Sequence, residues 1–439
     1  MHYLPNIIFA VCCLGAFGLF SRNIIRIRKN ILKGKKLHRS DQANRRWKNM
    51  FLVAIGQTKM VRRPVAGILH ILVYVGFVII NIELIEIILD GLLGTHRLFS
   101  SFLGALYTVL IASFEVLALG VLVAVLFFWT RRNITRIKRF WAPEMNGWPK
   151  KDGNFILYYE VVLMVLFLGM NATDALLQSR AIDPYIQAGA FPISQWLQPL
   201  FTQLSTPHLI LLERTFWWAH ILGIFSFLNY LYYSKHLHIL LAFPNTYYAN
   251  LQPKGKFAVN GAITHEVQLM FDPSTIASSD TSAVPEKFGA SEVYDLNWVQ
   301  LMNAFSCTEC GRCTSVCPAN LTGKKLSPRK IMMDTRDRME ELERRTPADK
   351  GGEVSDGKQL LGDYITPEEI WACTSCNACV EACPIEIDPL SIIMDLRQFL
   401  VMEQSAAPNA LNSMMSNIEN NGAPWPFNNQ DRLLWAQEN

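Results

Sequence analysis

Charged residues are scarce in this sequence. Asp, Glu, Lys and Arg make up 18% of its 439 residues, whereas hydrophobic residues make up 50%. A soluble protein has about 25% charged residues. The apolar residues are concentrated in the first 243 positions. The composition therefore excludes a chain that is soluble throughout, and it predicts a membrane-embedded half followed by a soluble half.

The sequence also lacks a glycine-rich nucleotide-binding motif. Neither Gly311 nor Gly352 belongs to a G-x-G-x-x-G pattern, in which the glycines let the backbone approach a pyrophosphate closely. This absence argues against NAD or FAD as a cofactor of the chain itself.

Eight of the ten cysteines form two runs with the spacing C-x2-C-x2-C-x3-C-P. This spacing is typical of bacterial ferredoxins with two [4Fe–4S] clusters, in which the fourth cysteine of each run ligates the other cluster. The predicted ligands of one cluster are Cys307, Cys310, Cys313 and Cys383, and those of the other are Cys373, Cys376, Cys379 and Cys317. Pro318 and Pro384 end the runs and keep the fourth ligand out of a helix.

A zinc site and a disulfide framework are the alternatives for these cysteines. Zinc sites usually take two pairs of ligands and not four cysteines followed by proline. Disulfides are rare on the reducing side of a membrane, where the charge pattern described below places this half. The remaining Cys12 and Cys13 lie in an apolar stretch and are expected to be small packing side chains.

Five apolar runs predict membrane-spanning helices, at about 5–21, 64–89, 102–129, 155–177 and 209–234. A signal peptide is the alternative for the first run. However, no basic stretch precedes it and no small-residue cleavage site follows it, so we expect a retained anchor. The fold class predicted is therefore mainly α, with a five-helix transmembrane bundle in front of a soluble domain.

The segments between these runs alternate in charge. Residues 22–50 contain eleven Lys and Arg against Asp41, and residues 131–151 contain seven more. The opposite segments, 90–101 and 178–208, have one arginine each, Arg97 and Arg180. The positive-inside rule then places the N-terminus outside and the cysteine-rich half in the cytoplasm. Residues 22–50 could alternatively bind acidic lipids.

Three histidines in or near the apolar runs are candidate haem ligands. His70 lies near the cytoplasmic end of the second run, His220 lies within the fifth, and His238 follows the fifth. Eighteen residues, or five turns, separate His220 from His238, so both would face the same way if the helix continued. His70 and His238 would then share one depth on different helices, as the two axial ligands of haem b require. His236 is expected to point to a different face.

Polar residues within a membrane indicate function by default, and each has a structural alternative. His220 could simply donate to a backbone carbonyl. The carboxyl groups of the apolar runs could relay protons or form helix–helix hydrogen bonds; they belong to Glu83, Glu86, Glu115, Glu160 and Glu213.

The first half resembles the haem b anchor subunits of respiratory nitrate reductase (gamma subunit) and heterodisulfide reductase. The resemblance rests on Gly67-Ile-Leu-His70 and on the histidine pair that ends Tyr-Ser-Lys-His236-Leu-His238. It implies a haem b held by His70 and His238. In the nitrate reductase anchor four histidines hold two haems, but one of those positions is Ile80 here. A second haem, on His220, therefore stays open.

The second half divides into a linker at 244–290, a two-cluster domain at 291–403 and a tail at 404–439 that we expect to dock a partner. Helices are expected at 291–305, 328–343 and 388–403, and another begins at Thr366-Pro-Glu-Glu. The domain resembles the iron–sulfur subunit of heterodisulfide reductase and the C-terminal half of succinate dehydrogenase iron–sulfur subunits. In larger membrane-bound relatives a segment like Asn-Gly-Ala-Pro-Trp425 leads into a CCG catalytic domain, and this sequence contains no CCG pair.

Together these features predict an electron-transfer subunit of a respiratory oxidoreductase in the inner membrane of a bacterium. It would connect a cytoplasmic partner, either a separate CCG-domain subunit or an electron-transfer flavoprotein, with the quinone pool. It would have no complete catalytic site of its own, and no nucleic-acid partner is expected. The alternatives are a non-catalytic relay or assembly subunit and a membrane redox sensor, although a sensor needs neither haem ligands nor paired clusters.

Overall fold

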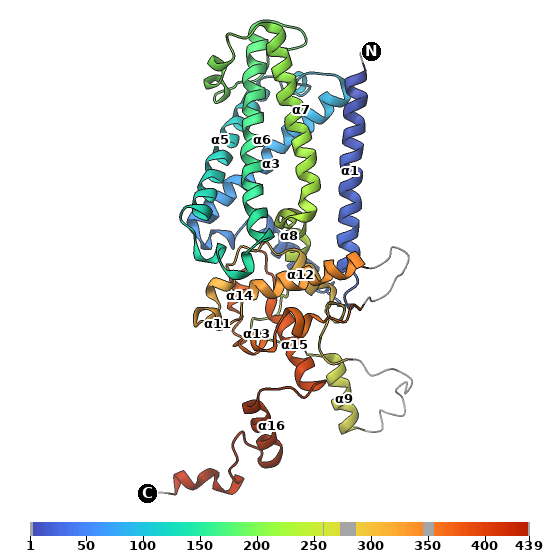
Figure 1. Cartoon of the computed structure of the whole chain (residues 1–439), viewed down its shortest axis with the longest axis vertical. Helices are drawn as coiled ribbons and strands as arrows, with labels where there is room; N and C mark the ends of the chain where they lie inside the picture. The colour runs from blue at the N-terminus through green and yellow to red at the C-terminus, as the bar shows by residue number, and fades with distance from the viewer. Residues whose placement is uncertain (1–2, 258, 273–286, 346–354, 438–439) are drawn as a thin grey trace.

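The computed structural model describes residues 3–257, 259–272, 287–345 and 355–437, and this part of the chain is mainly helical (Figure 1). No β-strand forms among these residues, apart from isolated bridges such as the one between Lys35 and Asn297. The prediction of a mainly helical chain is confirmed. The α-helices are α1 (Leu4–Ile31), α2 (Ala43–Met50), α3 (Pro64–Leu93), α4 (Ser100–Leu103), α5 (Ala105–Asn133), α6 (Trp148–Ser179), α7 (Thr206–Tyr230), α8 (His238–Tyr247), α9 (Gly261–Phe271), α10 (Trp298–Phe305), α11 (Pro318–Leu321), α12 (Pro328–Arg345), α13 (Pro367–Trp371), α14 (Ala378–Ala382), α15 (Pro389–Met402) and α16 (Asn409–Asn421).

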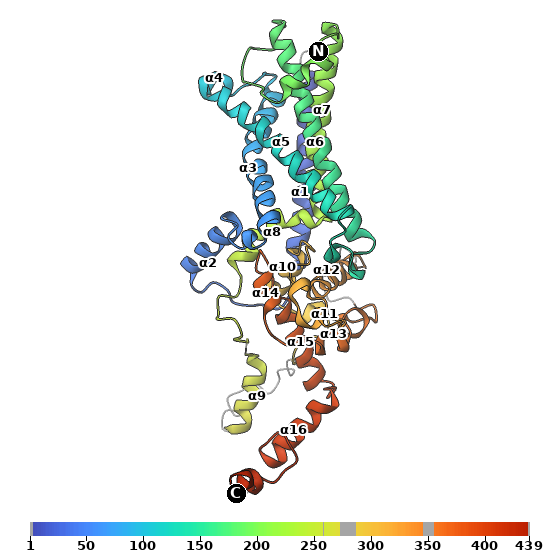
Figure 2. The same cartoon turned by 90° about the vertical axis from the view of Figure 1, so that its left-hand side faces the viewer.

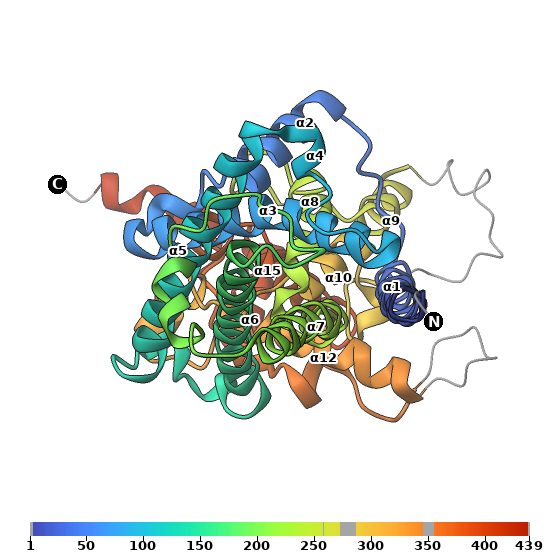
Figure 3. The same ribbon diagram turned by 90° about the horizontal axis from the view of Figure 1, so that it is seen from above.

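The five long helices α1, α3, α5, α6 and α7 form a bundle (Figures 1 and 2). Figure 3 shows α1, α6 and α7 nearly end-on. Within the described residues, four helices, α1, α3, α5 and α6, are long and apolar enough to cross a membrane. The fifth predicted span corresponds to α7, which is 25 residues long and packs against α6 and α1. The first helix is longer than predicted, because the basic residues after position 21 continue it to Ile31.

The helix α7 does not continue to His238. It ends at Tyr230, and two single 3-10 turns follow, Leu231–Tyr233 and Lys235–Leu237, separated by the extended Ser234. Asp152 of α6 stabilises this break by accepting bonds from the Tyr230 hydroxyl (2.5 Å) and the Lys235 backbone N–H (3.1 Å). A continuous helix was the condition for His220 and His238 to face the same way, and this condition is not met.

The cysteine-rich half forms a helical domain at one end of the bundle, below it in Figure 1. Its helices α10, α12 and α15 pack on one another around a core of buried aliphatic side chains. Thr366 and Glu369 form a capping box at the start of α13, as the sequence predicted. The predicted helices 328–343 and 388–403 correspond to α12 and α15, whereas the predicted helix 291–305 shortens to α10 behind a 3-10 turn at Val293–Asp295.

The predicted linker and tail contain helices of their own. Within 244–290, α8 extends to Tyr247 and α9 follows, while residues 273–286 lie outside the described part. In the tail, α16 is followed by a 3-10 helix, Asn429–Ala436, and both project away from the rest of the molecule (Figures 1 and 2).

Both basic segments between the long helices contact the cysteine-rich domain. After α1, the Lys35 backbone exchanges hydrogen bonds with Leu296 (2.8 Å) and Trp298 (3.1 Å). Between α5 and α6, Glu144 accepts from Arg329 (2.6 Å), whose side chain is fully buried. The segments predicted to be cytoplasmic therefore hold the domain against the bundle.

Candidate metal centres

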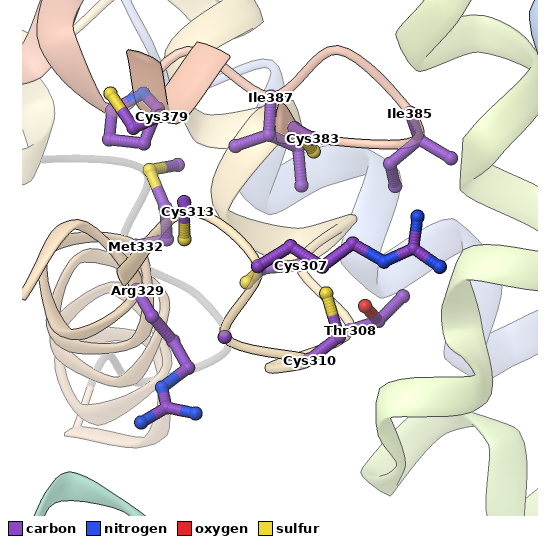
Figure 4. Close-up of a pocket in the computed structure, with 13 residues that line it drawn as sticks. Cys307, Thr308, Cys310, Cys313, Arg329, Met332, Cys379, Cys383, Ile385 and Ile387 are labelled. Carbon is purple, nitrogen blue, oxygen red and sulfur yellow. The ribbon is translucent and has the colours of Figure 1, made fainter. Parts of the chain in front are cut away.

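The first cysteine loop closes around a cavity together with a cysteine from the second run. Cys307, Cys310, Cys313 and Cys383 line this cavity, which has an empty volume of about 380 Å³ including open solvent. Figure 4 shows their four sulfur atoms around one space. The structure thus brings together the four residues that the sequence predicts as ligands of one cluster.

A second cavity collects the other predicted set. Cys373, Cys376, Cys379 and Cys317 line it, together with apolar residues such as Leu390, and its empty volume is about 310 Å³ including open solvent. The first cavity is lined by three cysteines of the first run together with Cys383 and Cys379 of the second. The second cavity is lined by three cysteines of the second run together with Cys317 of the first. Crossed ligation stays a prediction, and the arrangement of the thiols fits it.

Corresponding residues of the two runs adopt the same unusual backbone conformation. Glu309 (φ 54°) and Ser375 (φ 57°), each two residues after the first cysteine of its run, lie in the left-handed region. Their backbone N–H groups donate to the sulfur atoms of Cys307 and Cys373, both at 3.4 Å. Hydrogen bonds to cluster sulfurs tune the reduction potential, so the turn both shapes the loop and sets the electrostatics around the thiols.

The chemistry of the donor set fits a polynuclear cluster. Burial raises the pKa of Cys307 to about 12 and that of Cys383 to about 11, so thiolates form here only when a cation compensates their charge. Within the described residues, no group of three or more His, Cys, Asp or Glu side chains is arranged to hold a single metal ion. A [4Fe–4S] cube instead presents one iron to each of four separate thiolates, which matches thiols spread around a cavity.

Three histidines gather where α3 meets the break after α7. His70 interacts electrostatically with His238, and the rings of His236 and His238 lie 5.5 Å apart between their centroids. The ring Nδ1 of His238 lies 3.0 Å from the carbonyl oxygen of Lys235, an interaction that leaves Nε2 for a metal. Burial lowers the pKa of His238, which keeps the ring in the neutral form that ligates iron. These features fit an axial ligand pair that includes His70 and His238.

Two expectations about neighbouring histidines need correction or stay open. His236 does not point away from the predicted pair, because the 3-10 turn places its ring beside His238. His220 lies elsewhere in the bundle, where its ring packs with a centroid distance of 5.7 Å from the ring of Phe167 and hydrogen-bonds to the backbone of Leu163. The structure does not bring His220 to the other three histidines, and its haem role stays a prediction.

Lys235 and Glu309 connect the histidines with the first cysteine cavity. Lys235 begins the second 3-10 turn after α7, Lys235–Leu237. Its side chain is only 11% exposed and contacts Glu309 (2.7 Å) and the carbonyl of Pro149 (2.7 Å). Glu309 also pairs with Arg336 (3.0 Å). Sequence reasoning missed this link because only the fold brings residues 235 and 309 together, although a charged residue inside a cluster loop was a signal.

Comparison with known proteins identifies the domain type and several relatives. Residues 306–387 match the family model of the 4Fe-4S dicluster domain, which supports two [4Fe–4S] clusters. The chain is 27% identical over 435 residues to the probable iron-sulfur-binding oxidoreductase FadF of Bacillus subtilis, across 92% of this chain and 57% of that protein. It is 25% identical over 433 residues to the EtfAB:quinone oxidoreductase of Syntrophomonas wolfei, across 93% and 56%.

A third relative matches a shorter stretch. The probable membrane-anchored ferredoxin of Chromohalobacter salexigens is 31% identical over 165 residues, which cover 34% of this chain and 24% of that protein. The chain spans a little more than half the length of the first two relatives. No solved structure matches it. Its relatives are thus iron–sulfur oxidoreductases and ferredoxins, consistent with the cysteine cavities.

Proposed function

We propose that this chain is a membrane-bound electron-transfer subunit that passes electrons between a cytoplasmic redox partner and the quinone pool, through two [4Fe–4S] clusters and haem b. The observation that carries the proposal is the position of the histidine group. Lys235 fixes His238 through its carbonyl and binds the first cysteine loop through its side chain. Arg312 of the same loop interacts electrostatically with His70.

The chain's own residues would hold and separate the redox groups. The eight cysteines supply thiolates, and His70 and His238 supply imidazoles. Clusters and haem, when bound, exchange single electrons, whereas a quinone takes up two electrons and two protons. The tight contact between the cysteine loop and the bundle excludes bulk water between the two halves, as shown by the burial of Glu309 and Arg329.

We place five spans in the inner membrane of a bacterium, with α7 as the fifth, the N-terminus outside and the iron–sulfur domain in the cytoplasm. The lysine- and arginine-rich segments all lie at the end of the bundle that bears the domain, which supports this orientation. The ionisable Asp, Glu, Lys, Arg or His residues of α7 are His208, Glu213, Arg214 and His220, and most of the rest of the helix is apolar.

The partner is a flavoprotein or a separate CCG-domain subunit. The name of the Syntrophomonas relative links an electron-transfer flavoprotein with quinone. Cys376 of the second cavity is exposed, which suits electron entry there. The projecting tail, with exposed Trp425, Phe427 and Trp435, is our candidate for partner docking.

The test is reoxidation of the chemically reduced, full-length protein in detergent by a short-chain quinone. We expect quinone to reoxidise the wild type quickly and His70→Ala at least tenfold more slowly. His265→Ala, which changes an exposed histidine on α9, is the matched control. Equal rates for His70→Ala and the wild type would contradict the haem route. A wild type that quinone does not reoxidise would favour the non-catalytic relay.

A further inference from the structure

The end of the bundle farthest from the iron–sulfur domain contains a buried cluster of carboxyl groups, which we call the distal cluster. It consists of Glu83 and Glu86 of α3, Glu115 of α5 and Asp174 of α6, gathered around Arg97 of the α3–α4 loop, and all five side chains are buried. From the sequence, the glutamates were separate candidates for proton relay or helix–helix bonding. The structure joins Glu83 and Glu115 in one hydrogen-bonded network through Arg97 and Asn171, and Glu86 lies near the same arginine.

Arg97 donates two of its four side-chain hydrogen bonds to Asp174. Its Nε and Nη2 both donate to Asp174 Oδ2, at 3.1 and 2.9 Å, and Nη2 also donates to Asn171 (2.7 Å). Nη1 donates to Glu83 Oε1 at 2.9 Å. His96 Nε2 lies 2.9 Å from the other oxygen of Asp174. Asp174 is therefore the carboxylate that the guanidinium neutralises.

Two other carboxyl groups are satisfied by the loops that cover this end. Glu115 accepts from the backbone N–H groups of Ile193 (2.8 Å) and Ser194 (3.1 Å). Glu86 accepts from the Phe99 backbone N–H (2.7 Å) and the Tyr107 hydroxyl (2.8 Å).

Glu83 differs from these neighbours. Its side chain is 1% exposed, and its Oε2 atom is buried and has no hydrogen-bond partner among the described residues. The cluster has more buried carboxyl groups than cations even when His96 is counted as protonated. Uncompensated charge inside a membrane bundle is costly, and a proton on Glu83 removes one such charge.

We propose that the distal cluster is a proton-binding site, with Glu83 as the residue that holds the exchangeable proton. The ligand is thus a proton. Through this cluster the bundle would exchange protons with the aqueous phase on the side opposite the iron–sulfur domain. The use of that proton in quinone chemistry rests on the proposed function; the protonation of Glu83 does not.

The other titratable side chains at this end already have hydrogen-bond or ion-pair partners. Glu83 is therefore the carboxyl group that takes up the exchangeable proton. Asp90 caps the loop by accepting from the backbone N–H groups of Arg97 (2.8 Å) and Leu98 (3.2 Å). On the α7 side, Glu213 accepts from the Tyr185 hydroxyl (2.8 Å) and pairs with Arg214 (2.6 Å).

Infrared difference spectroscopy of the full-length protein in liposomes tests the proposal, because a protonated carboxyl group has its own C=O stretch that shifts in D2O. We expect the wild type to show this band near neutral pH and Glu83→Gln to lose it. Glu115→Gln and the exposed Glu368→Gln should both retain it. The readout needs neither haem nor quinone, so its failure is distinct from failure of the proposed function.

Three results would contradict the proposal. A folded Glu83→Gln protein that retains the whole band excludes Glu83 as the proton carrier, as does loss of the same band in Glu115→Gln alone. If Glu83→Gln does not fold, the wild type still decides: a spectrum without an exchangeable carboxyl band near neutral pH rules the site out. Glu83→Asp, which keeps a carboxyl group, should retain a shifted band.

Discussion

The side-chain nitrogen of Lys235 lies 2.7 Å from a carboxylate oxygen of Glu309, and this contact joins the two halves of the chain. The Lys235 carbonyl orients His238, and the Glu309 backbone N–H donates to Cys307. One pair of residues therefore touches a predicted haem ligand on one side and a predicted cluster ligand on the other.

Opposite charge changes at this pair should move the potential of the first cluster in opposite directions. Glu309→Gln removes a negative charge beside the cluster and should raise its reduction potential, whereas Lys235→Met should lower it. We expect shifts of several tens of millivolts, since about 1.4 kcal/mol corresponds to about 59 mV for one electron. Redox titration followed by electron paramagnetic resonance measures both. Shifts in the same direction would indicate a disturbed loop and not an effect of charge.

Crossed ligation predicts which cysteine variants resemble one another. The wild type should contain about eight non-haem irons. Cys383→Ala should lose the same cluster signal as Cys310→Ala, and Cys317→Ala the same signal as Cys376→Ala. Iron and acid-labile sulfide analysis, together with electron paramagnetic resonance, makes the comparison. If Cys383→Ala instead matches Cys376→Ala, each run ligates its own cluster.

Replacement of His70 or His238 by alanine should abolish a b-type haem spectrum, because one axial ligand leaves the iron weakly held. His236→Ala is the informative comparison, since its ring adjoins that of His238. We expect it to retain the spectrum with a changed potential. Loss of the spectrum in His236→Ala but not in His238→Ala would reassign the ligand. His220→Ala should remove about half the signal if a second haem is present.

The contact between Glu144 and Arg329 should stabilise the docked domain. Removing one partner of a buried ion pair costs about 3–5 kcal/mol, so Glu144→Ala should increase hydrogen exchange in the first cysteine loop. Lys325→Ala is the matched control, because Lys325 and its partner Glu368 are 68% and 63% exposed and ion pairs in water contribute little to stability. Similar exchange in both variants would show that Glu144 does not hold the domain.

The same contact has a defined pH dependence. Burial alone would raise the pKa of Glu144, but Arg329 and Ser327 together lower it overall. A lowered pKa in the folded state means that the contact contributes fully above the pKa of a free carboxyl group. This contribution is lost as the pH falls toward the folded-state value.

The orientation in the membrane can be tested by reporter fusions. Fusions after residues 60 and 250 should behave as cytoplasmic and one after residue 190 as external. The Met60 carbonyl accepts from Arg312 of the iron–sulfur domain, and Asn245 of α8 donates to the Ile385 carbonyl (2.7 Å). An external signal at residue 250 would mean that α7 does not cross the membrane.

Local patterns made much of the metal site predictable. The cysteine spacing predicts which cysteine of the other run completes each set of four ligands. The structure places Cys383 at the same cavity as Cys307, as this prediction requires. The helix that starts at Pro328 was equally predictable from the sequence, because proline at the first position of a helix is a local signal.

Contacts between distant segments account for what the sequence did not predict. The end of α7 depends on Asp152, which belongs to another helix and binds the backbone after the break. Glu83 and Asp174 meet only through Arg97. Similarly, the basic residues after α1 indicated an orientation in the membrane, but nothing in their sequence showed that Trp298 would bind there.

The contact between Trp298 and the segment after α1 also determines the order in which the parts of the protein assemble. The Trp298 indole donates to the Leu37 carbonyl, 261 positions earlier in the chain. At about 5–20 residues per second, the ribosome needs roughly 10–50 s to make the intervening chain. The segment after the first helix is thus complete long before its partner exists, and the membrane half inserts with that edge unpaired. Both cysteine loops follow all five long helices in the chain, so metal loading and docking of the iron–sulfur domain come after synthesis of the bundle.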